Sequence, residues 1–296
     1  MAVNVKKVAL FLGLTYALTY LLAIIYFLAG GTVKPPDILI VGVTYMFMPT
    51  LCAIVVQKLI YKAPLKKPLR INFRPNRWFL VAWLLPLLIA IATFGVALLI
   101  PGVTFSPDKP DNFRYLLLKP VQFGFEIETN KFAWAVFLNL LQGLLVGITV
   151  NALAGFGEEL GWRGFLLREL GGLGFWKASA LIGLVWGFWH APLIVQGINY
   201  PEHPWAGVFL MTVETLLSAP LVAYVCLKAD SVVAAAIFHG TGNGMSVLAT
   251  MGLEGGNDLL VGGTGLAGFL VLLVANLGLV VFDRWFGGNA ISSSYS

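Results

Sequence analysis

The sequence predicts an all-α, polytopic membrane protein: a bundle of about eight transmembrane helices around a polar cavity that faces the cytoplasm. Hydrophobic residues make up 58% of the 296-residue chain and charged residues 11%, whereas soluble domains average about 45–50% and about 25%. At a mean hydropathy of +0.85, too few polar residues remain to cover a water-facing surface. Apolar runs of about 20 residues, the length that crosses a bilayer, recur along the chain.

Eight such runs are expected to span the membrane. The first is longer than the apolar core of a signal peptide, so we predict that it is retained as a span. A continuous fourth helix from Ala133 to Leu170 would be about 57 Å long, so we expect either a break near Gly143 or Gly147 or a portion that lies in the outer interface. The eight are Val8–Ala29, Ile38–Ile60, Trp78–Ile100, one ending in the cluster at Glu158, Phe175–Ile194, Ala206–Leu227, Ser231–Thr250 and Val261–Phe282.

The basic residues predict the orientation of these spans. Most of the 19 Lys and Arg residues fall on the side that holds both termini, so the positive-inside rule places the termini in the cytoplasm and the protein in the cell membrane. The densest stretch, Lys58–Arg77, is interpreted as a topology signal lying on anionic lipid headgroups. It explains the net charge of +5 without any nucleic-acid partner, since no aromatic residues alternate along a basic face.

The remaining organisation is simple. The other side of the membrane holds one long segment of mixed charge, Pro101–Lys131, which we expect to be a loop or a lid on the surface. No internal repeat and no appended soluble domain is visible, so residues 1–296 are treated as a single integral membrane domain. Cys52 and Cys226 lie in apolar runs, which predicts buried free thiols.

Three polar clusters interrupt the apolar second half of the chain. They are Glu158-Glu159-Leu160-Gly161-Trp162-Arg163, Trp186-Gly187-Phe188-Trp189-His190 and His239-Gly240-Thr241-Gly242-Asn243. A charged group at the centre of a bilayer costs roughly 2.5–3.5 kcal/mol, so such groups persist mainly where they line a cavity and have a function. The clusters therefore predict an active site inside the membrane.

Helical spacing assigns the side chains of the first cluster to faces. Glu158 and Glu159 diverge by about 100°, while Arg163 follows Glu159 by four residues and shares its face. We expect Glu159 and Arg163 to form an ion pair that supports the site. Glu158 is then free to face the cavity, where a carboxylate can take a proton from water.

The two histidines of the other clusters complete the set. His190 follows Trp186 by four residues, and His239 precedes Asn243 by four. A histidine and a glutamate from different helices can hold a water molecule, and a histidine and an amide one turn apart can donate to an oxyanion. This set can hydrolyse a peptide bond without a protein nucleophile. Two simpler interpretations stay open: histidines that only pack, and a glutamate–arginine network at a helix end.

The motifs Glu158-Glu159-x-x-x-Arg163, aromatic-x-x-x-His190 and His239-x-x-x-Asn243, in this order, resemble the type II CAAX prenyl endopeptidases and the CAAX protease and bacteriocin-processing (CPBP, ABI) family. The resemblance implies an eight-helix intramembrane endopeptidase with a protease core at residues 133–250. It implies that Glu158 and His190 activate a water, that Glu159 and Arg163 support them, and that His239 and Asn243 stabilise the oxyanion. One departure is Trp186, where the eukaryotic pattern has Phe.

Cofactor and partner expectations follow from this resemblance. The implied substrate is a prenylated CAAX-type protein or another membrane-associated peptide, with membrane lipids as the surroundings. We expect no metal, because no H-E-x-x-H motif is present and Asn243 suits hydrogen bonding better than ligation; zinc held by Glu158, His190 and His239 is the alternative. A proton- or cation-coupled transporter and a non-catalytic immunity or scaffold protein are the other functions considered.

Overall fold

The computed structural model describes residues 3–34, 37–107, 132–286 and 291, and it confirms an all-α bundle. A short antiparallel pair, β1 (Thr104–Phe105) and β2 (Leu253–Glu254), joins two loops. The helices are α1 (Val5–Leu28), α2 (Asp37–Ile54) with a π-helical extension (Val55–Ile60), α3 (Arg77–Ala97), α5 (Phe132–Ile148), α6 (Val150–Glu159) with a π-helical extension (Leu160–Leu166), α7 (Leu167–Glu169), a 3₁₀ turn (Gly171–Leu173), α8 (Phe175–Trp189), α9 (Ala191–Ile194), α10 (Pro204–Ala229), α11 (Val232–Met245) and α12 (Leu266–Trp285).

Each predicted span contains a helix, but the helices differ in length. Within the described residues, five are long and apolar enough to cross a membrane, and the bent pair α5–α6 makes a sixth if it is counted as one span. The shorter α8 and α11 have 15 and 14 residues, or about 21–23 Å of helix. Their apolar runs stop early because the polar clusters lie at their ends: His190 caps α8, and Asn243 lies in the last turn of α11.

The expected break in the fourth span is present. Helices α5 and α6 meet at Thr149 with a bend of 46°, two residues after Gly147. Both predicted glycines lie against α11: a Cβ on Gly143 would be 2.6 Å from the carbonyl oxygen of Gly244, and one on Gly147 would be 2.8 Å from Cα of Thr241. The glycines therefore bring the backbones of α5 and α11 into contact beside the bend.

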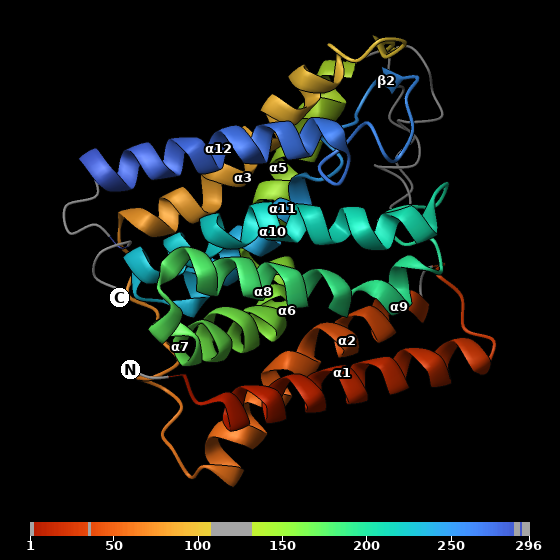
Figure 1. The fold of residues 1–296 in the computed structure, drawn as a ribbon. Helices are drawn as coiled ribbons and strands as arrows, with labels where there is room; N and C mark the ends of the chain where they lie inside the picture. Colours follow the sequence, from red (N-terminus) through yellow and green to blue (C-terminus); the bar gives the residue numbers. More distant parts are fainter. Residues whose placement is uncertain (1–2, 35–36, 108–131, 287–290, 292–296) are drawn as a thin grey trace.

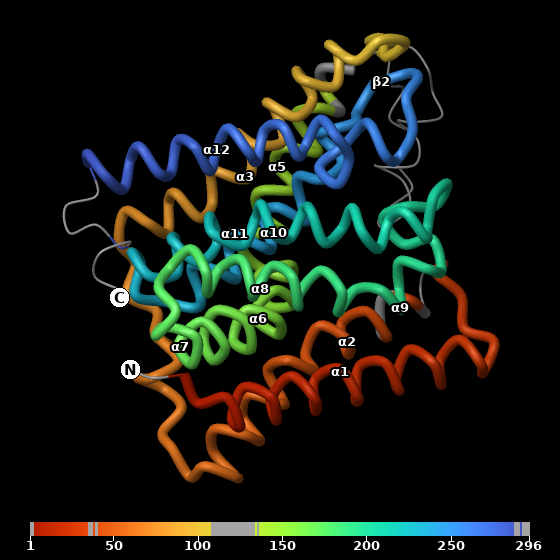
Figure 2. Tube along the Cα trace, in the orientation of Figure 1, coloured from red at the N-terminus to blue at the C-terminus, as the bar shows by residue number. Residues whose placement is uncertain are grey.

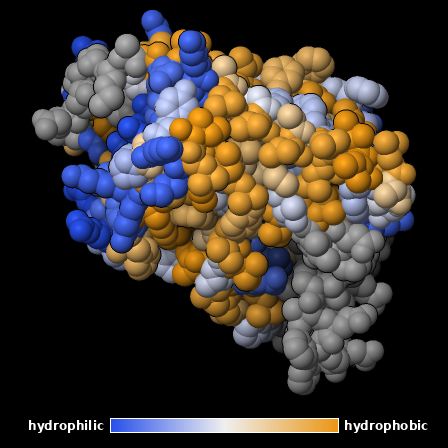
Figure 3. Space-filling model, turned by 90° about the horizontal axis from the view of Figure 1, so that it is seen from below, coloured by the Kyte–Doolittle hydropathy of each residue, from blue (hydrophilic) through white to orange (hydrophobic). Residues whose placement is uncertain are grey.

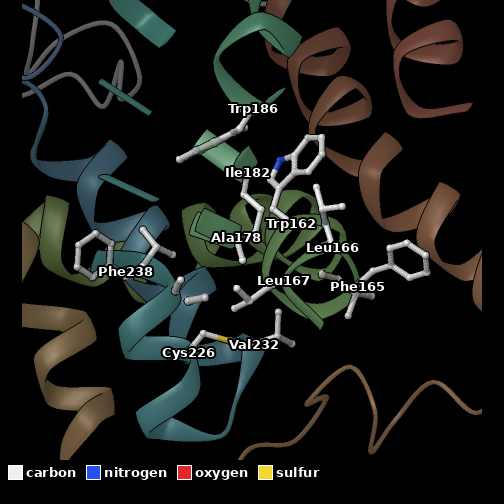
Figure 4. Packing of buried hydrophobic residues seen from close by; sticks show 14 of the residues in the cluster. Trp162, Phe165, Leu166, Leu167, Ala178, Ile182, Trp186, Cys226, Val232 and Phe238 are labelled. Carbon is white, nitrogen blue, oxygen red and sulfur yellow. The ribbon is translucent and has the colours of Figure 1, made fainter. Parts of the chain in front are cut away.

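The helices form layers around a central group. Figures 1 and 2 show α1 and α2 along one side of the bundle, α3 and α12 along the other, and α6, α8, α10 and α11 between them. Helix α11 contacts α3, α5 and α6, while α10 packs against α8. Figure 4 shows part of the core, where Trp162 and Leu166 of the π-helical extension lie near Ile182 of α8.

The outer surface separates apolar from basic regions. Apolar side chains cover the middle of the face in Figure 3, and hydrophilic side chains gather at one end. The start of α1 and the end of α12 lie at the same end of the bundle (Figure 1). There the Nζ of Lys7 donates to Gln57 and Glu169 at 2.6 and 2.8 Å, which ties α1 to α2 and α7. We call this the basic end, because it also carries the loop at residues 61–76.

Other sequence predictions meet different outcomes. Cys52 and Cys226 are buried and free, as predicted. Most of the predicted surface loop Pro101–Lys131 lies outside the described residues. His203, in the loop before α10, has its Nδ1 2.6 Å from Oδ1 of Asp258. This contact connects the loop before α10 to the loop before α12.

Small residues allow α8 and α10 to pack at backbone distance. Gly183 and Gly187 form a small-x-x-x-small pattern, which permits close helix approach in membranes. A Cβ on Gly183 would lie 2.7 Å from both Cα of Leu216 and the carbonyl oxygen of Thr215. The hydroxyl of Thr215 also donates to the carbonyl oxygen of Gly183 at 2.8 Å. This contact fixes α8, and with it the second polar cluster.

Replacing Gly183 with alanine should therefore destabilise the bundle. The new methyl group meets backbone atoms that cannot rotate away, and we expect a loss of about 1–3 kcal/mol, measured by unfolding in detergent. Gly278→Ala in α12 is the matched control, because nothing lies within 4 Å of its Cβ position; it should be neutral or slightly stabilising. Equal stability of the two variants would contradict this packing.

Candidate active site

A π-helical segment positions the first polar cluster. Glu158 and Glu159 end α6, and all residues of Leu160–Leu166 are buried. Single π-helical turns within α-helices often occur at functional sites. The segment approaches α2 closely, since a Cβ on Gly161 would lie 2.9 Å from the backbone carbonyl of Pro49. The structure thus packs α2 against the first polar cluster. The sequence analysis gave this helix no role in the site.

Glu159 connects the first cluster to the third. Its Oε1 accepts from Nη1 of Arg163 at 3.0 Å and from Nδ1 of His239 at 2.8 Å. Glu159 and Arg163 have no exposed surface, so neither charge reaches bulk solvent. The predicted ion pair between them is present, and it also fixes the ring of His239, which the spacing alone did not indicate.

Glu158 contacts a tryptophan at hydrogen-bond distance and a histidine at the limit of ion-pair distance. Its Oε2 accepts from Nε1 of Trp186 at 2.6 Å, and its Oε1 lies 4.0 Å from Nε2 of His239. The same indole ring lies 4.3 Å from the guanidinium carbon of Arg163. A hydrogen bond to a charged group is shorter and stronger than a neutral one. Trp186 therefore orients Glu158 and covers the cation beneath it.

A contact with a backbone carbonyl defines the tautomer of His190. Its Nδ1 lies 2.8 Å from the carbonyl oxygen of Trp186, and because a carbonyl only accepts, Nδ1 carries the proton. In the neutral ring, Nε2 then bears a lone pair. The ring centroid of Trp186 is 5.9 Å from that of His190 and 5.6 Å from that of His239. Both histidines therefore lie against one indole.

These side chains line a single cavity of about 390 Å³ at the centre of the bundle. Glu158, His190, His239 and Asn243 all contribute to its wall, which is otherwise mostly apolar. Of the six predicted site residues, Glu159 and Arg163 lie behind the wall. Asn243 is exposed in the last turn of α11. The structure thus gathers residues that are 85 positions apart in the sequence, from Glu158 to Asn243.

The cavity extends in a direction that the sequence did not predict. Its lining reaches Ile38 at the start of α2, Asn199 after α9 and Thr264 before α12, which lie at the end of the bundle away from the basic end. The sequence predicted an opening on the basic side.

Two participants were not assigned by the sequence analysis. Trp186 was noted for its spacing from His190 and as a departure from the eukaryotic pattern, but its N–H also donates to Glu158. Glu214 was missed entirely, and it lines the same cavity from the middle of α10. The signal was available, since Glu214 is the one acidic residue in the predicted span Ala206–Leu227, and an ionisable residue within a span is a functional candidate.

The residue types that bind a zinc ion line the cavity, but their side chains are not placed to hold one together. One carboxylate and two imidazoles, Glu158, His190 and His239, have the chemistry of a zinc site. In the part of the chain that the structure describes, however, no three His, Cys, Asp or Glu side chains are placed to hold a metal ion. The residues as arranged do not fit the ion, and we derive no step through one.

Comparison with known proteins supports the resemblance seen in the motifs. Residues 139–245 match the family model described as "Type II CAAX prenyl endopeptidase Rce1-like". A curated relative, CAAX prenyl protease 2 of Methanococcus maripaludis, is 36% identical over 90 residues, which are 28% of this chain and 32% of the relative. The match thus spans about a third of that protein. The region that the family model matches, from α5 to α11, contains all six predicted site residues.

The bond between Trp186 and Glu158 predicts a measurable coupling. Trp186→Phe keeps an aromatic ring but removes the N–H, and Glu158→Gln removes the charge that accepts from it. A hydrogen bond to a charged group is worth about 1.5–3 kcal/mol, so we expect a coupling energy of about 1–3 kcal/mol in a double-mutant cycle. Unfolding in detergent measures it. Effects that add without coupling would show that the indole does not hold Glu158.

Proposed function

We propose that this chain is an intramembrane endopeptidase that hydrolyses a peptide bond near the C-terminus of a prenylated or other membrane-associated peptide. One observation carries the proposal: Glu158, His190 and His239, from three separate helices, all contact Trp186 and line one cavity. The match of residues 139–245 to the CAAX endopeptidase family supports the same reaction. We assign residues 133–250 as the protease core of a single membrane domain.

In this proposal Glu158 and His190 activate the attacking water. The Oε1 of Glu158 and the bare Nε2 of His190 are the acceptors available at the cavity wall, because Trp186 occupies the other atom of each side chain. Glu158 takes a proton as the water oxygen bonds to the substrate carbonyl carbon. When the C–N bond breaks, that proton passes to the leaving amine, so no covalent enzyme intermediate is needed.

His239 and Asn243 stabilise the oxyanion. His239 lies between two carboxylates, with Glu159 at 2.8 Å and Glu158 at 4.0 Å, and these charges favour a positively charged ring. An imidazolium Nε2–H and the amide of Asn243 can both donate to the developing negative charge. Glu159 and Arg163 do not touch the cavity and act as positioning residues through His239 and Trp186.

The membrane orientation is part of the proposal. The Lys and Arg residues favour a cytoplasmic basic end in the cell membrane, with both termini on that side. In this orientation the described cavity extends toward the outer half of the bilayer. A substrate would then enter from that half, and an apolar peptide that already lies in the lipid is suited to this route.

Substitution of Glu158 tests the proposal. Purified wild type in lipid vesicles should cleave a membrane-associated reporter peptide, and Glu158→Gln should lower kcat by about 10²–10⁴-fold, the usual contribution of a general base. The matched control is Glu202→Gln, which removes an exposed carboxylate from a loop. Mass spectrometry of the products measures turnover, and a zinc chelator added to wild type should leave the rate unchanged.

Two results would contradict the proposal. Equal turnover by wild type and Glu158→Gln would remove Glu158 from the chemistry. Proteolysis by neither protein, together with an ion flux that depends on Glu158, would favour a transporter. Loss of activity with the chelator and its return with zinc would contradict only the metal-free step.

A further inference from the structure

Glu214 is a carboxylate in the cavity that the proposed reaction does not use. It lies in the middle of α10, and Met211, Ser218 and Val222 line the same cavity. Their spacing of three or four residues means that one stripe of α10 faces the cavity. Glu214 therefore presents its carboxylate to the space that holds Glu158, rather than to lipid.

The charge of Glu214 is poorly compensated by the protein. Ser218, one turn later on the same helix, lines the same cavity and carries no charge. Among the described residues, no Lys, Arg or His side chain forms an ion pair with Glu214, whereas Glu159 pairs with both Arg163 and His239 at 2.8–3.0 Å. An unpaired carboxylate in a low-dielectric site is costly, and a cation that binds beside it relieves the cost.

The rest of the wall limits what that cation can be. Leu193, Met211, Val222 and Leu272 line the cavity around Glu214, so the ligand that fits is apolar over most of its length. A hydrated inorganic ion would have to give up water against these apolar side chains. A lysine or arginine side chain brings its own apolar stem together with the charge.

We propose that Glu214 is a specificity-determining residue that binds a lysine or arginine side chain of an otherwise apolar peptide. The ion pair sets the register of the peptide, because it fixes one side chain of the substrate relative to Glu158 in the same cavity. This inference deepens the proposed function, since it names the chemistry of the substrate, and it rests on that function only where cleavage is concerned. Binding to the cavity tests it separately.

A pair of peptides provides the test. Each is a 12-residue fluorescent peptide of leucine and alanine, with a central lysine in one and norleucine, of the same length but uncharged, in the other. Binding to purified protein in lipid nanodiscs is measured by fluorescence anisotropy. Wild type should bind the lysine peptide about tenfold more tightly, as expected for one charge-assisted hydrogen bond. Glu214→Gln should bind both peptides within about twofold, while Glu214→Asp and Glu202→Gln should keep the preference.

Each outcome decides the proposal. Equal binding of the two peptides by wild type overturns it, and this comparison needs no variant to fold. A preference that persists in folded Glu214→Gln also overturns it, because the lysine would then bind elsewhere. The same peptides are analysed for cleavage: a lysine preference that depends on Glu214, without cleavage by wild type, supports this inference and counts against the proposed endopeptidase.

Discussion

The buried carboxylate of Glu159 is the constraint on which the site depends. It has no exposed surface, and a buried charge that lacks partners would cost several kcal/mol. Arg163, one turn along the same helix, and His239, from α11, share its Oε1. Compensation of one charge thus joins two helices and fixes the ring of His239. Arg163 pairs with Glu159 and not with the neighbouring Glu158, whose side chain lines the cavity.

Trp186 contacts three other residues of the site and holds each of them in a different way. Its N–H occupies one oxygen of Glu158, its backbone carbonyl occupies Nδ1 of His190, and its ring covers Arg163. The contacts with Glu158 and His190 each leave one atom of the partner free toward the cavity. The α8–α10 packing through Gly183 holds this residue in place. Helix packing one turn before Trp186 therefore helps to determine which lone pairs can take a proton.

Much of this could be predicted from the sequence because the strongest signals are local. Hydropathy predicted eight membrane helices, and five or six of the described helices are long and apolar enough to span. The length argument predicted the break beside Gly147, and the four-residue spacing predicted the pair Glu159–Arg163. Contacts between helices were harder. The spacing does not show which histidine reaches Glu159, and the pairing of Trp186 with Glu158 depends on how α8 rotates against α6. The direction of the cavity depends on where α8 and α11 end.

Glu214 is a different case, because the sequence signal existed and was not used. A single acidic residue at the centre of an apolar run predicts either a polar cavity or a free-energy cost of exposing the charge to lipid. In α10, Glu214 lies on the same stripe as Met211 and Ser218. The tertiary fold then places Glu214 on the wall of the cavity, where it can act on the substrate rather than on the water.

The most direct test of the account is the protonation of the histidine rings, measured by ¹⁵N NMR of the protein in bilayers. With only three histidines in the chain, His190 and His239 can be assigned by single substitution. The account predicts His190 with a protonated Nδ1 and a bare Nε2, and His239 protonated on both nitrogens between its two carboxylates. A bare Nδ1 on His190, or a His239 signal that is unchanged by Glu159→Gln, would contradict the account.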